Sequence, residues 1–591
     1  MFSRGVDGFR QLLDEFAYRA TAVIDRILLW RRLPPPVATG YVRSSEYVAV
    51  RDGTRIAVDT YRPARQSVPV EGRFPVVWAF ERYHRARVED GRLVTRLDRE
   101  TWLKLLVRHG YVVSVADLRG SGASFGTREH LVTEFDRWDA YDITEWLAAQ
   151  PWSNGRVGMF GKSFMGLMQF LAASTAPPHL RAIFPEKTLF DLYSFAYPGG
   201  VFRHDYARAW GNNVTALDRT TAAAPVDEDP GGRLLAQAVA EHQHNCDSYD
   251  VFSRMPFRDS VPPNGSGRSY ADMSPAQYRR EIAASGVAIY QLAGWDDMWP
   301  RDALLWHANL SNPRKLLIGP WPHTYDSGWK LFPERLRWFD HWLKERPSTT
   351  MDGPQVRFHT AGARAGRQWR SAREWPIAST RQSCLYFGDK GALVESPASD
   401  QEASDSYVVD YSSTSGQATR WSNGYGRAFR YSDLRANDAK GLSFTTPPLS
   451  ADLEITGHPV VCVWISTAAA DVDLFVYLEE VRSNGYSAYV SEGIQRASHR
   501  RETIPPFNNL NLPFHASLGD EVLDLPQRQV VRLAFDLHPV SRVFRRGRRI
   551  RVTITGADVD NALTPVLRPA PSVAVHRAAR YPSHIMLPTI S

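Results

Sequence analysis

The chain has 591 residues, more than one hydrophobic core accommodates, which predicts two or three domains. Apolar residues make up 43% of the chain and charged residues 23%, which excludes a chain that is disordered throughout. The net charge of +7 is small for this length, and the densest basic run, residues 545–549, leads directly into an apolar strand pattern. We therefore expect no nucleic-acid partner.

Cysteines and the N-terminal residues bear on the compartment. Cys246, Cys384 and Cys462 are scattered and odd in number, which argues against a disulfide framework and favours a reducing environment. The first residues lack the pattern of a signal peptide, and charges interrupt every candidate membrane span. We expect a cytoplasmic protein without an integral membrane segment. The Cys and His spacings also predict no metal site.

The first predicted elements are a helix and a hairpin. Residues 6–30 place apolar side chains at helical spacing, and this amphipathic helix ends before three prolines at 34–36. Residues 46–50 and 55–61 then alternate apolar and polar side chains around an Asp-Gly turn, which indicates a β-hairpin.

Strand and helix patterns alternate over the next part of the chain. Nearly continuous apolar runs, typical of strands buried on both faces of a parallel sheet, occur at 74–80, 111–117, 156–161, 287–295 and 314–320. Helical patterns occur at 101–110, 138–150 and 334–345. This alternation predicts an α/β fold with a parallel sheet.

Two further regions depart from that alternation. Residues 191–285 are rich in polar, proline and aromatic residues and predict a helical insertion placed to act as a lid. After the last helix the pattern is that of strands alone, which predicts a β-sandwich. The expected division is an N-terminal helix (1–36), the first part of the α/β core (37–190), a lid (191–285), the second part of the core (286–350) and a β-sandwich (351–591).

The stretch GMFGKSFMG, residues 158–166, lies between a predicted strand and a predicted helix. This strand, turn and helix order is the context of a nucleophile elbow, in which Ser163 would stand on a sharp turn at a helix N-terminus. The closing glycine comes one residue later than in G-x-S-x-G. Serine is also a common helix N-cap, so the motif alone leaves both interpretations open.

An acid and a base follow in the order that a Ser-Asp-His set requires. GWDD, residues 294–297, directly follows one predicted strand, and GPWPH, residues 319–323, directly follows the next. Because parallel strands end at the same sheet edge, we expect Ser163, one of the two aspartates and His323 to lie close together.

The motifs PWSNGRVGMFGKSFMG, GWDD, IGPWPH and DLRGSGASFG resemble those of the bacterial cocaine esterase and Xaa-Pro dipeptidyl-peptidase family, which also contains the α-amino acid ester hydrolases. That family uses a G-x-S-[YF]-x-G elbow, which accounts for the late glycine. The resemblance covers all but about the first forty residues. It implies an α/β-hydrolase fold with a helical cap and a C-terminal jelly roll.

The resemblance also implies roles for individual residues. Ser163 matches the nucleophile and His323 the base, and Asp297 is favoured over Asp296 as the acid because the family's acid is the last residue of G-W-x-D. Tyr83 matches a tyrosine whose hydroxyl forms half of the oxyanion hole, although Glu81-Arg82 replaces the usual preceding residues.

The remaining parts of the mechanism follow from these roles. The backbone N–H of Phe164 would be the second oxyanion donor. Trp295, Trp299 and Trp321 flank the acid and histidine loops, where they either line an apolar acyl pocket or pack beneath the loops. No metal or organic cofactor is required. The expected reaction is hydrolysis of a small ester through an acyl-enzyme.

Two alternatives remain open. A peptidase that releases Xaa-Pro dipeptides from a short peptide substrate would need a carboxylate for the substrate amine, and the lid offers Asp191, Glu241, Asp247 and Asp250. A binding protein with a vestigial triad is the alternative of another class. The sequence also leaves the oligomeric state open, a homo-oligomer included.

Overall fold

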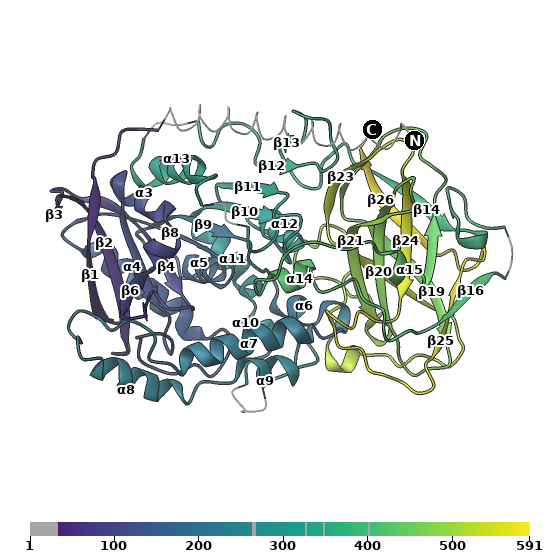
Figure 1. The fold of residues 1–591 in the computed structure, drawn as a ribbon, viewed down its shortest axis with the longest axis horizontal. Helices are drawn as coiled ribbons and strands as arrows, with labels where there is room; N and C mark the ends of the chain where they lie inside the picture. The colour runs from purple at the N-terminus through teal and green to yellow at the C-terminus, as the bar shows by residue number, and fades with distance from the viewer. Residues whose placement is uncertain (1–32, 263–266, 326–327, 347–348, 400–401, 591) are drawn as a thin grey trace.

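The computed structural model describes residues 33–262, 267–325, 328–346, 349–399 and 402–590. The amphipathic helix predicted over residues 6–30 lies outside the described residues. A mixed α/β part occupies the left of Figure 1, and a part built mainly of antiparallel strands occupies the right.

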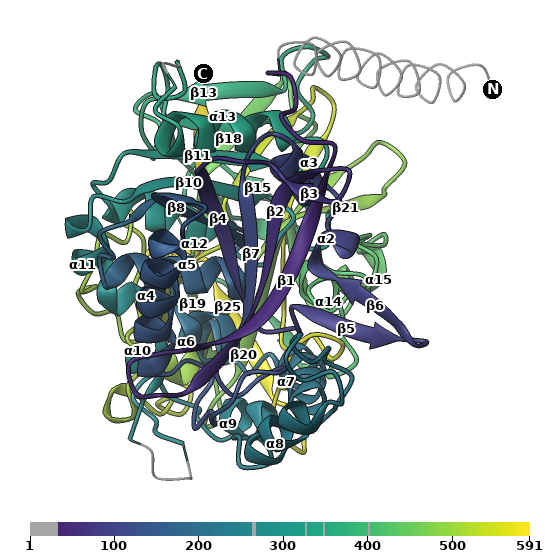
Figure 2. The same ribbon diagram turned by 90° about the vertical axis from the view of Figure 1, so that its left-hand side faces the viewer.

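Eleven strands of the described chain form one sheet, in the order β1-β2-β7-β4-β8-β9-β10-β11-β12-β13, with β3 beside β2. They are β1 (Gly40–Ala49), β2 (Arg55–Arg65), β3 (Val68–Pro69), β4 (Phe74–Glu81), β7 (Val112–Asp117), β8 (Ser153–Lys162), β9 (Leu180–Glu186), β10 (Ala288–Gly294), β11 (Arg314–Gly319), β12 (Val356–His359) and β13 (Trp369–Ala372). The strands from β7 to β12 run parallel, while β1, β2 and β13 run antiparallel to their neighbours. Figure 2 shows the twist of this sheet.

The predicted hairpin and the predicted parallel strands are confirmed. Strands β1 and β2 pair antiparallel around the Asp52-Gly53 turn, with Glu46 opposite Val58. Every residue of β7 and all but the first residue of β4 are buried, as continuous apolar runs predict for central strands. The sequence patterns did not indicate β9, because Arg181 and Pro185 interrupt its apolar run.

Helices cover both faces of the sheet. They are α2 (Arg96–Arg99), α3 (Trp102–Arg108), α4 (Glu134–Ala149), α5 (Phe164–Ser174), α12 (Pro300–Asn309) and α13 (Phe332–Leu343). Helices α4, α5 and α12 share one hydrophobic core with the sheet, and α3 and α13 share another with its opposite face. Helix α4 begins four residues before the predicted helix, because Thr133 and Asp136 cap its first turn reciprocally. A small hairpin of β5 (Ala86–Glu89) and β6 (Arg92–Thr95) precedes α2.

The segment between β9 and β10 contains helices and no named strand among its described residues. These helices are α6 (Leu192–Ala196), α7 (His204–Asp218), α8 (Arg233–His242), α9 (Ser248–Ser253), α10 (Tyr270–Met273) and α11 (Arg279–Ala284). Helices α7, α8 and α9 run along the lower side of the molecule in Figure 1. We call this segment the helical insertion.

Two antiparallel sheets make up most of the C-terminal part, and side chains of both form one hydrophobic core. The larger sheet contains β14 (Arg381–Phe387), β15 (Leu393–Val394), β16 (Ser404–Val408), β18 (Leu453–Gly457), β19 (Val460–Thr467), β22 (Val531–Asp536), β23 (Val540–Phe544), β25 (Ser572–His576) and β26 (His584–Ile590). The smaller sheet contains β17 (Leu442–Thr445), β20 (Asp473–Val481), β21 (Ser487–Arg496) and β24 (Arg549–Thr555). Short helices α14 (Arg420–Asn423) and α15 (Arg435–Asp438) lie in the loops.

The strands after residue 350 do not all belong to the C-terminal part. Strand β12 continues the parallel ladder of β11, with Leu316 opposite Val356, and β13 closes this edge antiparallel. The expected boundary at residue 351 therefore differs from the structure, in which the first sheet extends to Ala372. The four-residue runs of β12 and β13 show too little pattern to identify the sheet that they join.

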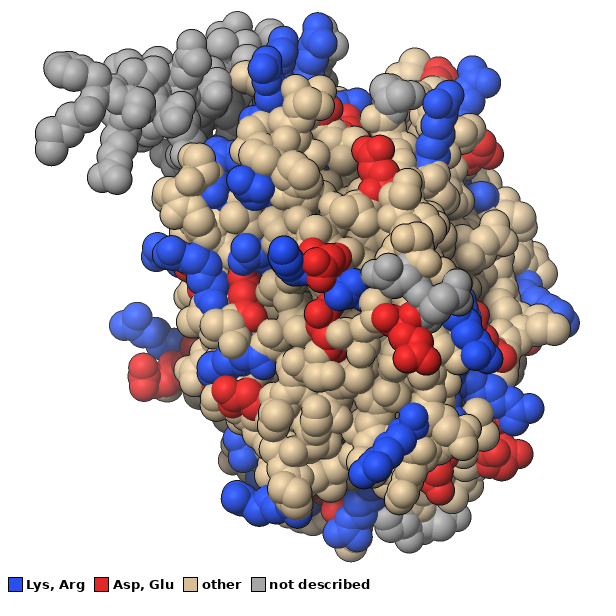
Figure 3. Space-filling model, turned by 90° about the vertical axis from the view of Figure 1, so that its right-hand side faces the viewer, with Lys and Arg blue, Asp and Glu red and all other residues tan. Residues whose placement is uncertain are grey.

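Surface and thiol features complete the fold. Cys246, Cys384 and Cys462 are all free thiols. Among the described residues, no helix combines the length and the apolarity that crossing a membrane requires. On the face shown in Figure 3, basic and acidic side chains are interspersed. Arg545, in the basic run, pairs with Asp452 at 2.7 Å.

We predict that Gly199→Ala destabilises the protein. Gly199 has a φ of +58°, and an added Cβ would lie 2.1 Å from the backbone oxygen of Ile494 in β21. Left-handed strain and overpacking together should cost about 1–3 kcal/mol and lower the midpoint of thermal unfolding by several degrees. Gly231→Ala is the matched control, because no atom lies within 4 Å of its added Cβ. Equal midpoints for the two variants would contradict the prediction.

Candidate active site

Ser163 stands on a strained turn between β8 and α5. Its φ and ψ are 63° and −122°, a left-handed conformation that non-glycine residues rarely adopt and that costs about 1–3 kcal/mol. The turn is held because Ser163 N–H donates to the Glu186 carbonyl at 2.9 Å, and the Thr188 hydroxyl donates to the Ser163 carbonyl at 2.8 Å. Such over-determined strain is typical of functional sites.

The two glycines of the motif are explained by close packing around this turn. A Cβ on Gly161 would lie 2.5 Å from the Cβ of Met165, and a Cβ on Gly166 would lie 2.8 Å from that of Thr188. The closing glycine stands at position 166 because that face of α5 packs against the residues after β9.

Asp297 and His323 come from loops that follow neighbouring strands, β10 and β11. The Nδ1 atom of His323 lies 2.8 Å from Asp297 Oδ1, and both side chains are buried. Since β8, β10 and β11 run parallel, all three loops lie at one edge of the sheet, as the sequence predicts.

Burial and charge set the protonation of this pair. Burial alone would raise the pKa of Asp297, but His323 and Lys187 outweigh it and hold the pKa below its ordinary value. Burial lowers the pKa of His323, and Asp297 opposes that shift. The result is a neutral imidazole beside an ionised carboxylate near neutral pH, which is the state of a general base.

Asp296 faces a different environment. It lines a separate cavity with Tyr431, Tyr489 and Arg542, and burial raises its pKa. The geometry therefore brings Asp297, and not Asp296, to the histidine.

Lys187, at the end of β9, holds the histidine loop from behind. It is buried, and its Nζ donates to the carbonyls of Pro322 at 2.7 Å, His323 at 3.2 Å and Tyr325 at 3.2 Å. Burial lowers its pKa to about 7, against the opposing effect of Asp297. The sequence analysis missed Lys187, although a lysine directly after an apolar strand at the same sheet edge was the available signal.

Helix α14 of the C-terminal part fixes both loops. Arg420 donates through Nη1 to the Asp297 carbonyl at 2.9 Å, and Asn423 Oδ1 accepts from the backbone N–H of Thr324 at 2.9 Å. Both side chains are buried. Because these contacts join residues about 100 positions apart, no local sequence pattern predicts them.

Tyr83 lies beside Ser163 on the loop after β4. Burial raises its pKa, while the hydrogen bond from Trp210 opposes the shift, so the hydroxyl is neutral over the physiological range. Phe164 is the first residue of α5, and the first N–H groups of a helix have no intrahelical acceptor. Ser163 thus lies close to the Tyr83 hydroxyl and to the first backbone N–H groups of α5.

An apolar cavity of about 30 Å³ opens next to Ser163. Its lining consists of Tyr83, Leu131, Val132, Ser163, Phe164, Leu167, Leu189, Leu192, Phe195, Tyr206, Trp210, Phe252 and Trp299. Six of these residues belong to the helical insertion: Leu189, Leu192, Phe195, Tyr206, Trp210 and Phe252. We call this cavity the serine pocket; none of its lining residues carries a formal charge.

The three tryptophans named from sequence lie in different places. Trp299 lines the serine pocket and packs edge-on against His323, with ring centroids 5.1 Å apart. Trp295 instead donates to the His359 carbonyl at 2.7 Å. Trp321 stacks on Tyr325 beneath the loops. Only Trp299 of the three therefore borders the pocket.

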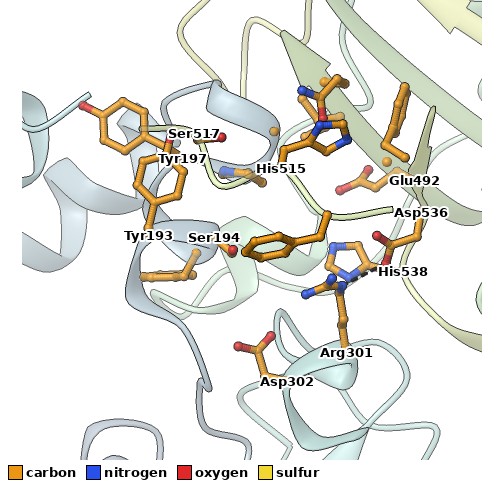
Figure 4. A pocket seen from close by; sticks show the side chains of 18 of the residues that line it. Tyr193, Ser194, Tyr197, Arg301, Asp302, Glu492, His515, Ser517, Asp536 and His538 are labelled. Atoms are coloured by element: carbon orange, nitrogen blue, oxygen red, sulfur yellow. Dashed lines mark hydrogen bonds and ion pairs between the residues drawn. The ribbon is translucent and has the colours of Figure 1, made fainter. Parts of the chain in front are cut away.

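A second cavity of about 130 Å³, with charged side chains in its lining, lies between α12, the helical insertion and the C-terminal part (Figure 4). It shares Phe195 and Trp299 with the serine pocket. Its arginines are paired: Arg301 lies 2.9 Å from Asp536, and Arg258 lies 2.6 Å from Asp191. The first pair joins α12 to the C-terminal part, and Arg258 joins the insertion to the C-terminal part by donating from Nε to the Ala516 carbonyl at 2.8 Å.

Comparison with known proteins identifies the family of the chain. A family model described as X-Pro dipeptidyl-peptidase (S15 family) matches residues 52–325, and one for the C-terminal non-catalytic domain of X-Pro dipeptidyl-peptidase matches 349–585. A predicted serine esterase of Mycobacterium bovis is 33% identical, over 94% of this chain and 96% of the relative. Cocaine esterase of Rhodococcus sp. is 24% identical, over 93% and 98%.

A solved structure shows the same fold. The CocE/NonD family hydrolase of Staphylococcus aureus superposes with a TM-score of 0.72 at 19% identity, over 93% of this chain and 94% of that chain. The mixed α/β part followed by a domain of mainly antiparallel strands is therefore the fold of these hydrolases. The chain belongs to the X-Pro dipeptidyl-peptidase (S15) family of hydrolases, in which its relatives include serine esterases, and it is an enzyme of the esterase type.

Proposed function

We propose that the protein hydrolyses carboxylic esters through an acyl-enzyme on Ser163. The observation that carries this proposal is the strained Ser163 in the lining of a pocket that is otherwise uncharged and mainly apolar. The hydrogen-bonded pair of His323 and Asp297 at the same sheet edge supports it. The helical insertion then acts as a cap, and the C-terminal part corresponds to the family's jelly roll.

The reaction proceeds by two acyl transfers. His323 accepts the proton of Ser163 Oγ as the oxygen attacks the ester carbonyl, and Asp297 stabilises the resulting imidazolium. The Tyr83 hydroxyl and the Phe164 N–H donate to the oxyanion of the tetrahedral intermediate. His323 returns the proton to the leaving alcohol, and the acyl-enzyme forms. Water then attacks the acyl carbonyl with the same proton transfers and releases the acid and free Ser163.

The pocket lining supports an uncharged, apolar acyl group. A peptidase of the Xaa-Pro type holds the substrate ammonium with a carboxylate, and no carboxylate of the described residues lines the serine pocket. The four candidates in the insertion have structural partners elsewhere. Asp191 pairs with Arg258, Glu241 accepts from Gly126 N–H, Asp247 caps α9 and Asp250 pairs with Arg254. Ester hydrolysis is therefore favoured over dipeptide release.

We predict that Ser163→Ala lowers kcat for p-nitrophenyl acetate by at least about 10³-fold, because the members of a triad act as a unit. Circular dichroism and thermal melting would verify that the variant is folded. Turnover close to that of the wild type in a folded Ser163→Ala protein would refute the nucleophile.

Asp297→Asn and Asp296→Asn form a matched pair. The first change removes the carboxylate that fixes the His323 tautomer and should lower kcat by about 10³–10⁴-fold. The second alters a carboxyl group in a separate cavity and should change kcat by no more than about threefold, since the triad stays intact. Steady-state kinetics on one ester would compare them, and a larger loss in Asp296→Asn would assign the acid to the other residue.

The pH dependence of kcat/KM should have an acidic limb with an apparent pKa below 6.5. Burial lowers the pKa of His323, and only its neutral form accepts the Ser163 proton, so activity rises with pH through that value and is level above it. The measurement uses an ester without ionisable groups at pH 5–8, with circular dichroism at each pH as a control. An apparent pKa above 7 for a folded enzyme would contradict this assignment.

A further inference from the structure

The loop that carries Tyr83 is attached to helix α7 of the insertion at several points. Trp210 in α7 donates from Nε1 to the Tyr83 hydroxyl oxygen at 2.9 Å. Arg82, the preceding residue, forms a buried bidentate pair with Asp218 at the end of α7, one arm of which measures 2.8 Å. The His84 ring contacts the Leu217 carbonyl at 3.1 Å.

These contacts account for the departure of this chain from the family pattern before Tyr83. Glu81 Oε1 accepts from the Tyr83 backbone N–H at 2.8 Å, while its Oε2 pairs with Arg96 at 2.6 Å. Arg82 reaches α7, as described above. Glu81 and Arg82 thus hold the tyrosine loop from two sides, on the core and on the insertion.

The direction of the bond from Trp210 follows from its chemistry. An indole N–H only donates, so the Tyr83 oxygen accepts this bond. A phenol has a single proton, and that proton is then left for another acceptor. Tyr83 and Ser163 line the same cavity, and the Ser163 oxygen becomes part of the tetrahedral intermediate.

We propose that Trp210 is a positioning residue of the oxyanion hole: its N–H occupies the acceptor side of the Tyr83 hydroxyl, so that the hydroxyl proton points at the oxyanion. This inference rests on the proposed function of Tyr83. Because Trp210 belongs to the insertion, the oxyanion hole is complete only while α7 lies against the tyrosine loop. Accepting one hydrogen bond also polarises the hydroxyl and strengthens the bond that it donates.

Trp210 also packs in the serine pocket, so its packing must be separated from its hydrogen bond. Its ring stacks on Phe164 with centroids 6.1 Å apart and meets Phe252 edge-on. Replacing Trp210 by benzothienylalanine keeps the bicyclic ring and removes only the N–H. Trp210→Phe is the genetically simpler variant. Trp299→Phe is the matched control, since Trp299 lines the same pocket and its Nε1 has no hydrogen-bond partner among the described residues.

The experiment is a double-mutant cycle on kcat for p-nitrophenyl acetate. Tyr83→Phe should lower kcat by about 10²–10³-fold, as loss of one oxyanion donor does. Loss of the N–H at position 210 should lower kcat by about tenfold, with KM within about threefold of the wild type, because the bond acts once charge has developed. In a Tyr83→Phe background the same change should have no further effect on kcat, whereas the effect of Trp299→Phe should persist.

The possible outcomes distinguish a failure of the proposed oxyanion role of Tyr83 from a failure of the proposed role of Trp210. If Tyr83→Phe keeps kcat within a few-fold of the wild type, the oxyanion role in the proposed function fails, and the role of Trp210 fails with it. If Tyr83→Phe loses activity but the benzothienylalanine variant does not, Trp210 only packs. An equal loss at position 210 with and without the Tyr83 hydroxyl overturns the proposal as well, because the effect then bypasses Tyr83.

Discussion

The buried hydrogen bond between His323 and Asp297 is the contact on which the rest of the site depends. Both residues stand on loops, and loops position side chains only when other groups hold their backbones. Here Lys187 binds three carbonyls of the histidine loop, and Arg420 binds the carbonyl of Asp297 itself. A 2.8 Å bond between two buried side chains is thereby fixed from the sheet on one side and from the C-terminal part on the other.

This arrangement gives the C-terminal part a role in positioning the site. The family model names its counterpart non-catalytic, and none of the described residues of this part lines the serine pocket. Yet α14 reaches both loops, through Arg420 and Asn423. The helical insertion makes the complementary contribution, because Trp210 and Asp218 of α7 bind the tyrosine loop. The C-terminal part and the helical insertion therefore both hold loops of the α/β core at the carboxyl ends of its parallel strands.

Local sequence patterns were sufficient to predict the elements and candidate residues that depend on neighbouring residues alone. The hairpin and the buried strands follow from side-chain periodicity. The strand, turn and helix context of its glycines makes Ser163 a candidate nucleophile, and the Asp and His motifs that follow in order favour that interpretation over a helix N-cap. Asp297 and His323 follow from their positions after consecutive parallel strands. The choice between Asp297 and Asp296 came from the family motif, and the geometry at His323 agrees with it.

Features that depend on contacts between residues distant in sequence could not be predicted. Trp295, Trp299 and Trp321 are equally close to the loops in sequence, but only Trp299 borders the serine pocket, because the direction of a loop side chain depends on distant neighbours. The contacts of Trp210 and Arg420 join residues more than 100 positions apart, and β12 and β13 are too short to identify their sheet from sequence.

The central claim is that Ser163 carries the acyl group during turnover. Rapid mixing of the enzyme with excess p-nitrophenyl ester, acid quenching and mass spectrometry of the intact chain and its peptides test it directly. The account predicts a mass increase of one acyl group, located on the peptide that contains Ser163, and a burst of p-nitrophenol if deacylation is the slower step. An acyl group on another residue, or turnover of the ester without acylation of Ser163 even when deacylation is slowed, would contradict it.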